Sequence, residues 1–195
     1  MRKFGTRFFR QLCLYVFLGC FVFLAGCGKD SGTPPEVLLE GASVVVGKTT
    51  PDSLKEAGFT INNLEKGLVN LPDQSWTTFI YLVKDKNSYA SLILSNRSSK
   101  AKPVGQCVIE EVGFFGLDDT YKDLDLSING VNPIGKTSEE LAELYPGLEL
   151  DGRESDDERF HYLTDGDYTI CFQYKNDVLT DIDVKHSFNK SYEPK

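Results

Sequence analysis

The sequence predicts an α+β fold made of two repeated units, each with a short helix packed on an antiparallel sheet. Two stretches carry the repeat, "LLEGASVVVGKTTPDSLKEAGF" (residues 38–59) and "SINGVNPIGKTSEELAELYPG" (residues 127–147). Both contain a glycine turn, a short extended run, Gly-Lys-Thr and a helical segment. Three strand-like runs follow each stretch, with the apolar alternation that is typical of strands. We therefore expect one unit over residues 37–117 and a second over residues 118–195, each a hairpin, a helix and a three-strand meander.

Each expected helix has its own start and stop signals. In the second unit, Thr137 is suited to the N-cap position, and Glu140 three residues later completes a capping box. In the first unit, Thr50 precedes Pro51, which fits the first helical position because its missing N–H is not needed there. Gly58 then ends that helix.

The strand-like runs are "WTTFIYLVKD", "SYASLILSN" and "CVIEEVGFF" in the first unit and "ERFHYLTD", "DYTICFQYK" and "LTDIDVKHS" in the second. The pairs Asp165-Gly166 and Asn176-Asp177 are typical of tight hairpin turns. Antiparallel strands joined in this way commonly bury one face only, so the helices should cover one face of the sheet.

The first 26 residues have the pattern of a secretory signal peptide. Four basic residues and no acid precede an almost wholly apolar stretch, "LCLYVFLGCFVFL" (residues 12–24). This stretch is shorter than the roughly 20 apolar residues that span a membrane. We expect residues 27–36, which are rich in Gly, Pro, Ser and charge, to form a tether.

The apolar stretch ends in Leu24-Ala25-Gly26-Cys27, which resembles the lipobox of bacterial lipoproteins. The resemblance implies cleavage before Cys27 and a diacylglycerol on its thiol. Because two or more acyl chains anchor a protein stably, the mature chain is expected to be held at the cell membrane or outer membrane, on its extracytoplasmic face. The Gly-Lys-Thr helix starts (residues 47–59 and 135–147) resemble those of SmpA/BamE-like lipoproteins and of β-lactamase inhibitor proteins. That second resemblance implies paired α/β units and transfers no functional residue.

The expected mature chain is strongly acidic. Removing 26 of the 195 residues leaves 169, and the leader takes four of the 21 basic residues but none of the 29 acids, which gives a net charge of −12. This charge argues against nucleic acid as a partner. "GVNPIGKT" (residues 130–137) matches a phosphate-binding loop in form, but the alternating run before it suits a half-exposed strand, so no nucleotide is expected.

Cys107 and Cys171 remain after cleavage, in a compartment where a disulfide can form. Two alternatives stay open, a bridge between them or two separate buried thiols. His161 and His186 fit no zinc or nucleophile motif, and a Cys171–His pair is the sole candidate for a reactive thiol. We expect no enzyme activity, no catalytic residue, no cofactor and no metal site.

The sequence favours a lipid-anchored envelope or surface protein that binds another protein. Aromatic residues in or near the strands could dock the partner on a sheet face; they are Trp76, Tyr81, Tyr89, Tyr162, Tyr168 and Tyr174. The alternative is a lipoprotein that binds a small ligand or a metal ion through the acidic loop at residues 151–158, because carboxylates at this density can collect a hard cation.

Overall fold

A computed structural model describes residues 32–63, 67–150, 158–187 and 193–194. The chain divides into two compact units, Met1–Asp30 and Ser31–Lys195, and all described residues belong to the second unit. The lipobox cysteine Cys27 and most of the acidic loop lie outside the described residues. Within the described part of the chain, no helix is both long and apolar enough to cross a membrane.

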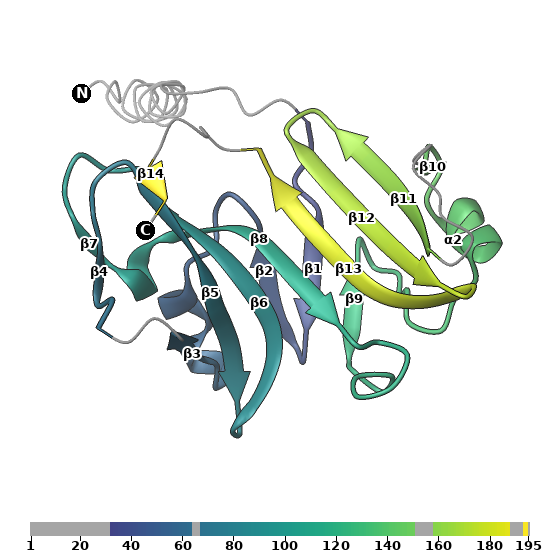
Figure 1. The fold of residues 1–195 in the computed structure, drawn as a ribbon, viewed down its shortest axis with the longest axis horizontal. Helices are drawn as coiled ribbons and strands as arrows, with labels where there is room; N and C mark the ends of the chain where they lie inside the picture. The colour runs from purple at the N-terminus through teal and green to yellow at the C-terminus, as the bar shows by residue number, and fades with distance from the viewer. Residues whose placement is uncertain (1–31, 64–66, 151–157, 188–192, 195) are drawn as a thin grey trace, which may run out of the picture. The chain divides into compact units, whose positions relative to one another are not determined.

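The largest sheet joins the strands of both predicted units (Figure 1). Its spatial order is β10 (Glu149–Leu150), β11 (Glu158–Asp165), β12 (Tyr168–Lys175), β13 (Val178–His186), β8 (Val108–Phe115), β6 (Asn87–Asn96) and β5 (Ser75–Lys84). Each neighbouring pair along this path is antiparallel. On the outer side of β5, β3 (Thr60–Asn63) pairs antiparallel with one end, and β14 (Glu193–Pro194) pairs parallel with the other.

A three-stranded sheet packs on one side of the large sheet. It contains β1 (Glu36–Leu39), β2 (Ala42–Val45) and β9 (Leu126–Ile128), with β1 between the other two. Buried residues of both sheets belong to one continuous apolar core. In Figure 1 this small sheet lies behind the large one. A separate two-stranded sheet pairs β4 (Asn70–Leu71) with β7 (Lys102–Pro103).

The helices in the described residues are short, and the α+β prediction is therefore wrong. They are the 3-10 helices η1 (Pro51–Ala57) and η2 (Val104–Gln106) and the α-helix α2 (Ser138–Leu144). Strands dominate the rest of the described chain. The segment at Pro51–Ala57 is a 3-10 helix and ends at Gly58, which adopts the left-handed conformation.

The two meanders also fail to form separate helix-on-sheet units. Strand β13 pairs with β8 from Asp181 opposite Phe115 to Lys185 opposite Glu111, which joins the meanders edge to edge. Pairing of this kind removes two exposed strand edges, which is favourable because an unpaired edge leaves backbone polar groups without partners. In addition, β1 from the first predicted unit pairs with β9 from the second.

The end of the predicted tether is held by the folded unit. The backbone N–H of Thr33 donates to Asp165 Oδ2 at 2.9 Å, and that of Glu36 donates to Asn129 Oδ1 at 3.0 Å. Asp165 ends β11, and Asn129 follows β9. The segment at residues 33–36 is therefore held by contacts at the end of β11 and just after β9.

The capping box predicted for α2 is confirmed. The backbone N–H of Glu140 donates to Thr137 Oγ1 at 3.2 Å, and the backbone N–H of Thr137 donates to Glu140 Oε2 at 2.9 Å. We expect Thr137→Ala to lower the free energy of unfolding by about 1 kcal/mol, because the Glu140 N–H loses its side-chain acceptor. Urea denaturation measures the change. Ser99→Ala, at an exposed position, is the control, and an equal loss there would contradict the assignment.

Candidate functional site

One face of the large sheet is not covered by any other strand or helix that the structure describes (Figure 1). The side chains of Ile170, Val184 and Val112 are buried in the core. Because side chains alternate along a strand, the next residue on each of these strands points to the opposite face of the sheet. Strand register places six of these residues in one row across six strands, in the order Tyr162, Cys171, Asp183, Gly113, Ser91 and Tyr81. Because the small sheet lies behind the large one in Figure 1, this face points toward the viewer.

Two further rows extend this surface on either side. One runs through Phe160, Gln173, Asp181 and Phe115, and the other through Thr164, Thr169, Lys185, Glu111 and Ile93. We call the residues of the three rows the open face. Most of their side chains are half-buried, and Phe115 is 48% exposed. In the described part of the chain, no other strand or helix lies over them in Figure 1.

Three side chains converge over Gly113 at the centre of the open face. A Cβ atom on Gly113 would lie 2.7 Å from Asp183 Oδ1, 2.8 Å from Ser91 Oγ and 3.0 Å from the Phe115 ring. Any side chain at position 113 would therefore push these groups apart. Because Gly113 has no side chain, the Asp183 carboxylate, the Ser91 hydroxyl and the Phe115 ring can all lie close to its backbone.

Charged groups surround this centre. Lys185 Nζ lies 3.5 Å from Asp183 Oδ2 and 3.7 Å from Glu111 Oε2. Burial raises the pKa of the Asp183 carboxyl, and the nearby charge of Asp181 raises it further, while Lys185 lowers it. The pKa of Lys185 is raised because Asp183 and Glu111 outweigh the effect of burial. Two carboxylates, those of Asp183 and Glu111, thus share the Lys185 ammonium group, and we call these three residues with Gly113 the Gly113 cluster.

The structure separates the tyrosines that the sequence grouped together. Tyr81 and Tyr162 lie on the open face and are half-buried. Tyr168 and Tyr174 point into the core, where 2% and 1% of their surfaces are exposed. Tyr89 packs edge-on against the buried ring of Phe59, with 5.7 Å between the ring centroids. Phe115 and Phe160 complete the aromatic set of the open face.

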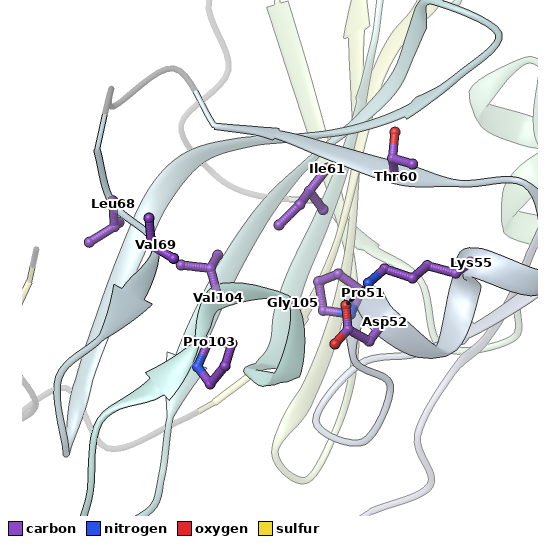
Figure 2. Close-up of a pocket in the computed structure, with 10 residues that line it drawn as sticks. All are labelled: Pro51, Asp52, Lys55, Thr60, Ile61, Leu68, Val69, Pro103, Val104 and Gly105. Carbon is purple, nitrogen blue, oxygen red and sulfur yellow. Dashed lines mark ion pairs between the residues drawn. The ribbon is translucent and has the colours of Figure 1, made fainter.

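A cavity of about 440 Å³ lies between η1, β3 and the segment that leads into η2 (Figure 2). Its apolar wall is formed by Ile61, Leu68, Val69, Pro103 and Val104. Figure 2 shows the side chains of Asp52 and Lys55 directed toward each other beside it, and their ion pair measures 2.7 Å. The volume falls in the range of small-molecule sites.

A buried ionic cluster lies where β6, β8 and β13 meet. Glu110 is fully buried and accepts two hydrogen bonds from Arg97, from Nε at 2.8 Å and from Nη2 at 2.6 Å. The hydroxyl of Ser95 also donates to Glu110. His186 Nδ1 lies 2.9 Å from Glu110 Oε2, and its ring packs against Tyr168. Burial alone would raise the pKa of Glu110, but the hydrogen bonds from His186, Arg97 and Ser95 hold it below its usual value.

Sequence reasoning missed this cluster because its members are far apart in the chain. Glu110 sits at an irregularity of the β6–β8 register, where Ile93 pairs with Glu111 and Leu94 with Ile109. The signal available in the sequence was the Glu-Glu pair inside an apolar strand run, since a bulge can place an extra residue of this kind.

Cys107 and Cys171 are both free thiols in the structure and both are buried. Cys107 immediately precedes β8, and Cys171 lies in β12, with β13 between these strands. Burial raises the pKa of the Cys107 thiol to about 11, although Lys102 lowers it slightly. Cys107 is therefore protonated and unreactive near neutral pH.

The two histidines lie apart from Cys171. His161 is opposite Phe172 in register, and His186 is opposite Tyr168, so both side chains share the core face of the sheet. Cys171 points to the open face. His161 Nε2 lies 2.9 Å from Ser138 Oγ at the start of α2, and its ring packs edge-on against Tyr174. The geometry thus separates the residues of the candidate thiol–imidazole pair.

No group of three or more His, Cys, Asp or Glu residues in the described ranges is arranged to hold a metal ion. The acidic loop is outside these ranges except for Glu158, which begins β11. Comparison with known proteins found no matching family model, no matching curated protein and no matching solved structure. The geometry of the described residues is therefore what bears on function.

Proposed function

We propose that this chain is a lipid-anchored, non-enzymatic protein of the cell envelope, and that it binds another protein through the open face. The observation that carries the proposal is the uncovered face itself, which combines aromatic rings and charged groups on six adjacent strands. Aromatic anchors surrounded by polar groups are typical of the centres of protein interfaces. The anchor would be the lipid on Cys27, which places the protein on the extracytoplasmic side of the membrane.

The open face is also well suited to rigid docking. Its residues lie mainly on β12, β13, β8 and β6, which have neighbours on both sides. Paired strands hold side chains in fixed positions, so little conformational entropy is lost when a partner binds. Half-buried rings such as Tyr81 and Tyr162 have already lost part of their rotamer freedom.

Site-specific photo-cross-linking tests the proposal. A photo-reactive amino acid at position 162, in the full-length lipoprotein in its native membranes, should cross-link one recurring envelope protein. The matched control carries the same amino acid at position 144, where Leu144 is an exposed apolar residue of α2, 43% exposed. Equal cross-linking at both positions, or none at position 162, would refute docking through the open face.

Small-ligand or metal binding is the second candidate function. The cavity of Figure 2 favours a small ligand, because an apolar wall and a neighbouring ion pair suit a molecule with one charged end. The acidic loop would serve a metal ion, as the sequence suggests. Under the protein-binding proposal, we expect calcium to leave the melting temperature of the folded protein unchanged within about 1 °C. A rise of several degrees would instead favour the metal site, because a ligand that binds the native state stabilises it.

A further inference from the structure

We propose that the cavity of Figure 2 binds a small amphipathic amine, with its ammonium group at Asp52 and its apolar chain against Ile61 and Val69. The inference goes beyond docking through the open face, because no open-face residue lines this cavity. It follows from the separation of charged and apolar groups in the cavity, from the fixed position of Asp52 and from the acidity of the chain.

The cavity has a charged end and an apolar end. Figure 2 shows the Asp52–Lys55 ion pair at one end and Val69 toward the other. Ile61 lies between them. Val69 is 70% exposed, and a ligand chain that covers it would remove apolar surface from water, which is favourable. The cavity therefore suits a ligand with one charged and one apolar end, and its volume of about 440 Å³ is sufficient for such a molecule.

The apolar wall is held in place by backbone pairing. The N–H of Val104 donates to the carbonyl oxygen of Val69 at 3.0 Å, which ties the exposed valine to the start of η2. Ile61 lies on β3, opposite Leu82 of β5. Because this wall is already ordered, a ligand loses little binding energy in arranging it.

Asp52 is the fixed charge of the cavity. It lies in the first turn of η1, and its carboxylate is 35% exposed. A Cβ atom on Gly105 would overlap with Asp52 Oδ1, so this carboxylate lies close to the backbone of η2. Lys55 is 63% exposed on a long flexible stem, and an exposed ion pair of this kind contributes little to stability. A ligand ammonium can therefore replace Lys55 at Asp52, while the lysine side chain turns toward solvent.

The charge of the chain selects a cation over an anion. A ligand carboxylate could bind only at Lys55, where the fixed carboxylate of Asp52 would repel it. The whole chain also carries a net charge of −8, which raises the local concentration of cations and lowers that of anions. The ligand class is therefore an ammonium group on an apolar chain.

Ligand-observed NMR tests the proposal with three probes of equal chain length, octylammonium, octanol and octanoate. The full-length chain is placed in phosphatidylcholine nanodiscs, and empty nanodiscs provide the reference for probe that enters the lipid. We expect octylammonium to bind the protein about tenfold more tightly than octanol, because a charge-assisted hydrogen bond to Asp52 is added. Octanoate should bind more weakly than octanol.

Substitutions at the two ends of the cavity localise the binding. Asp52→Asn keeps the shape of the side chain, removes its charge and should weaken octylammonium binding about tenfold. Lys55→Gln removes the competing ammonium group and should strengthen it about twofold. Val69→Ser should weaken the binding of octylammonium and octanol alike, by about threefold. The matched controls are Asp177→Asn and Lys136→Gln, which change exposed members of ion pairs outside the cavity and should have no effect.

Several results would overturn the amine site. They are tightest binding of octanoate, weaker octylammonium binding in Lys55→Gln, equal effects of Asp52→Asn and Asp177→Asn, or no binding of octylammonium by the protein. Thermal melting of each variant shows whether a loss of binding comes from unfolding. None of these results bears on the open face, which cross-linking at position 162 tests separately, so the failure of one proposal leaves the other standing.

Discussion

Glu110→Ala is expected to lower the free energy of unfolding by about 2–4 kcal/mol, because the buried Ser95 hydroxyl and His186 ring and the partly exposed Arg97 guanidinium lose their shared carboxylate. Glu110 is fully buried and accepts from both Arg97 and Ser95. After the substitution, the Arg97 guanidinium keeps its charge, while the His186 ring loses the carboxylate at 2.9 Å. Urea denaturation at pH 7 measures the loss.

A double substitution distinguishes the destabilisation caused by an unpaired charge from the net stabilisation that the Glu110–Arg97 ion pair provides. Replacing Glu110 and Arg97 together by methionine removes both charges and retains apolar volume. Replacement of a whole buried pair by apolar residues is often neutral or stabilising, so the double variant should be more stable than Glu110→Ala. If the double variant is as unstable as the single one, the packing of this region rather than its charge pairing determines the loss.

The ionic cluster around Glu110 predicts that the stability of the fold depends on pH. The pKa of Glu110 is lower in the folded state than its usual value of about 4.3, so its ionised form stabilises the fold. This contribution is complete above the unfolded pKa and is lost as the pH falls through the folded pKa. Between pH 5 and pH 3, the wild type should therefore lose more stability than Glu110→Gln, whose side chain does not titrate. Parallel losses over this range would contradict the role assigned to Glu110.

Local structure was predictable where the signal is local. The Thr137–Glu140 capping box, the Pro51 start and the Asn176-Asp177 turn each depend on residues a few positions apart, and the structure contains all three elements. The type of helix at residues 51–57 was not predictable in this way. Gly58 ends this helix after the same seven residues that form the α-helix α2, so helix length does not explain why this pattern gives a 3-10 helix.

The arrangement of the strands could not be read from the same patterns. Nothing in the runs of β8 and β13 specifies that these two edges pair with each other, because the choice of edge is made by the packing of the whole core. Register irregularities at Gln173/Tyr174 and Ile93/Leu94 also reset which residues face the core. Since a shift of one residue reverses the face of every later side chain, the open face could be identified only from the paired strands.

The second large effect is expected from alanine substitution of the glycines in the two Gly-Lys-Thr elements. These glycines have the same backbone conformation but different surroundings. Gly47 has φ +80° and Gly135 has φ +72°, both in the left-handed region. A Cβ atom on Gly47 would lie 3.0 Å from the nearest ring carbon of His186, whereas no atom lies within 4 Å of one on Gly135. The His186 ring cannot withdraw easily, since Glu110 holds its Nδ1 and Tyr168 packs against its face.

Gly47→Ala should therefore lower the free energy of unfolding by about 2–4 kcal/mol, from the left-handed backbone and from crowding against the ring. Gly135→Ala should cost about 1–2 kcal/mol, from the backbone alone. Urea denaturation of both variants gives the difference. Equal losses would show that His186 moves aside freely and that its contacts with Glu110 and Tyr168 do not fix the ring. A larger loss at Gly47 would show that this glycine has a packing role at the buried cluster, which its counterpart at position 135 lacks.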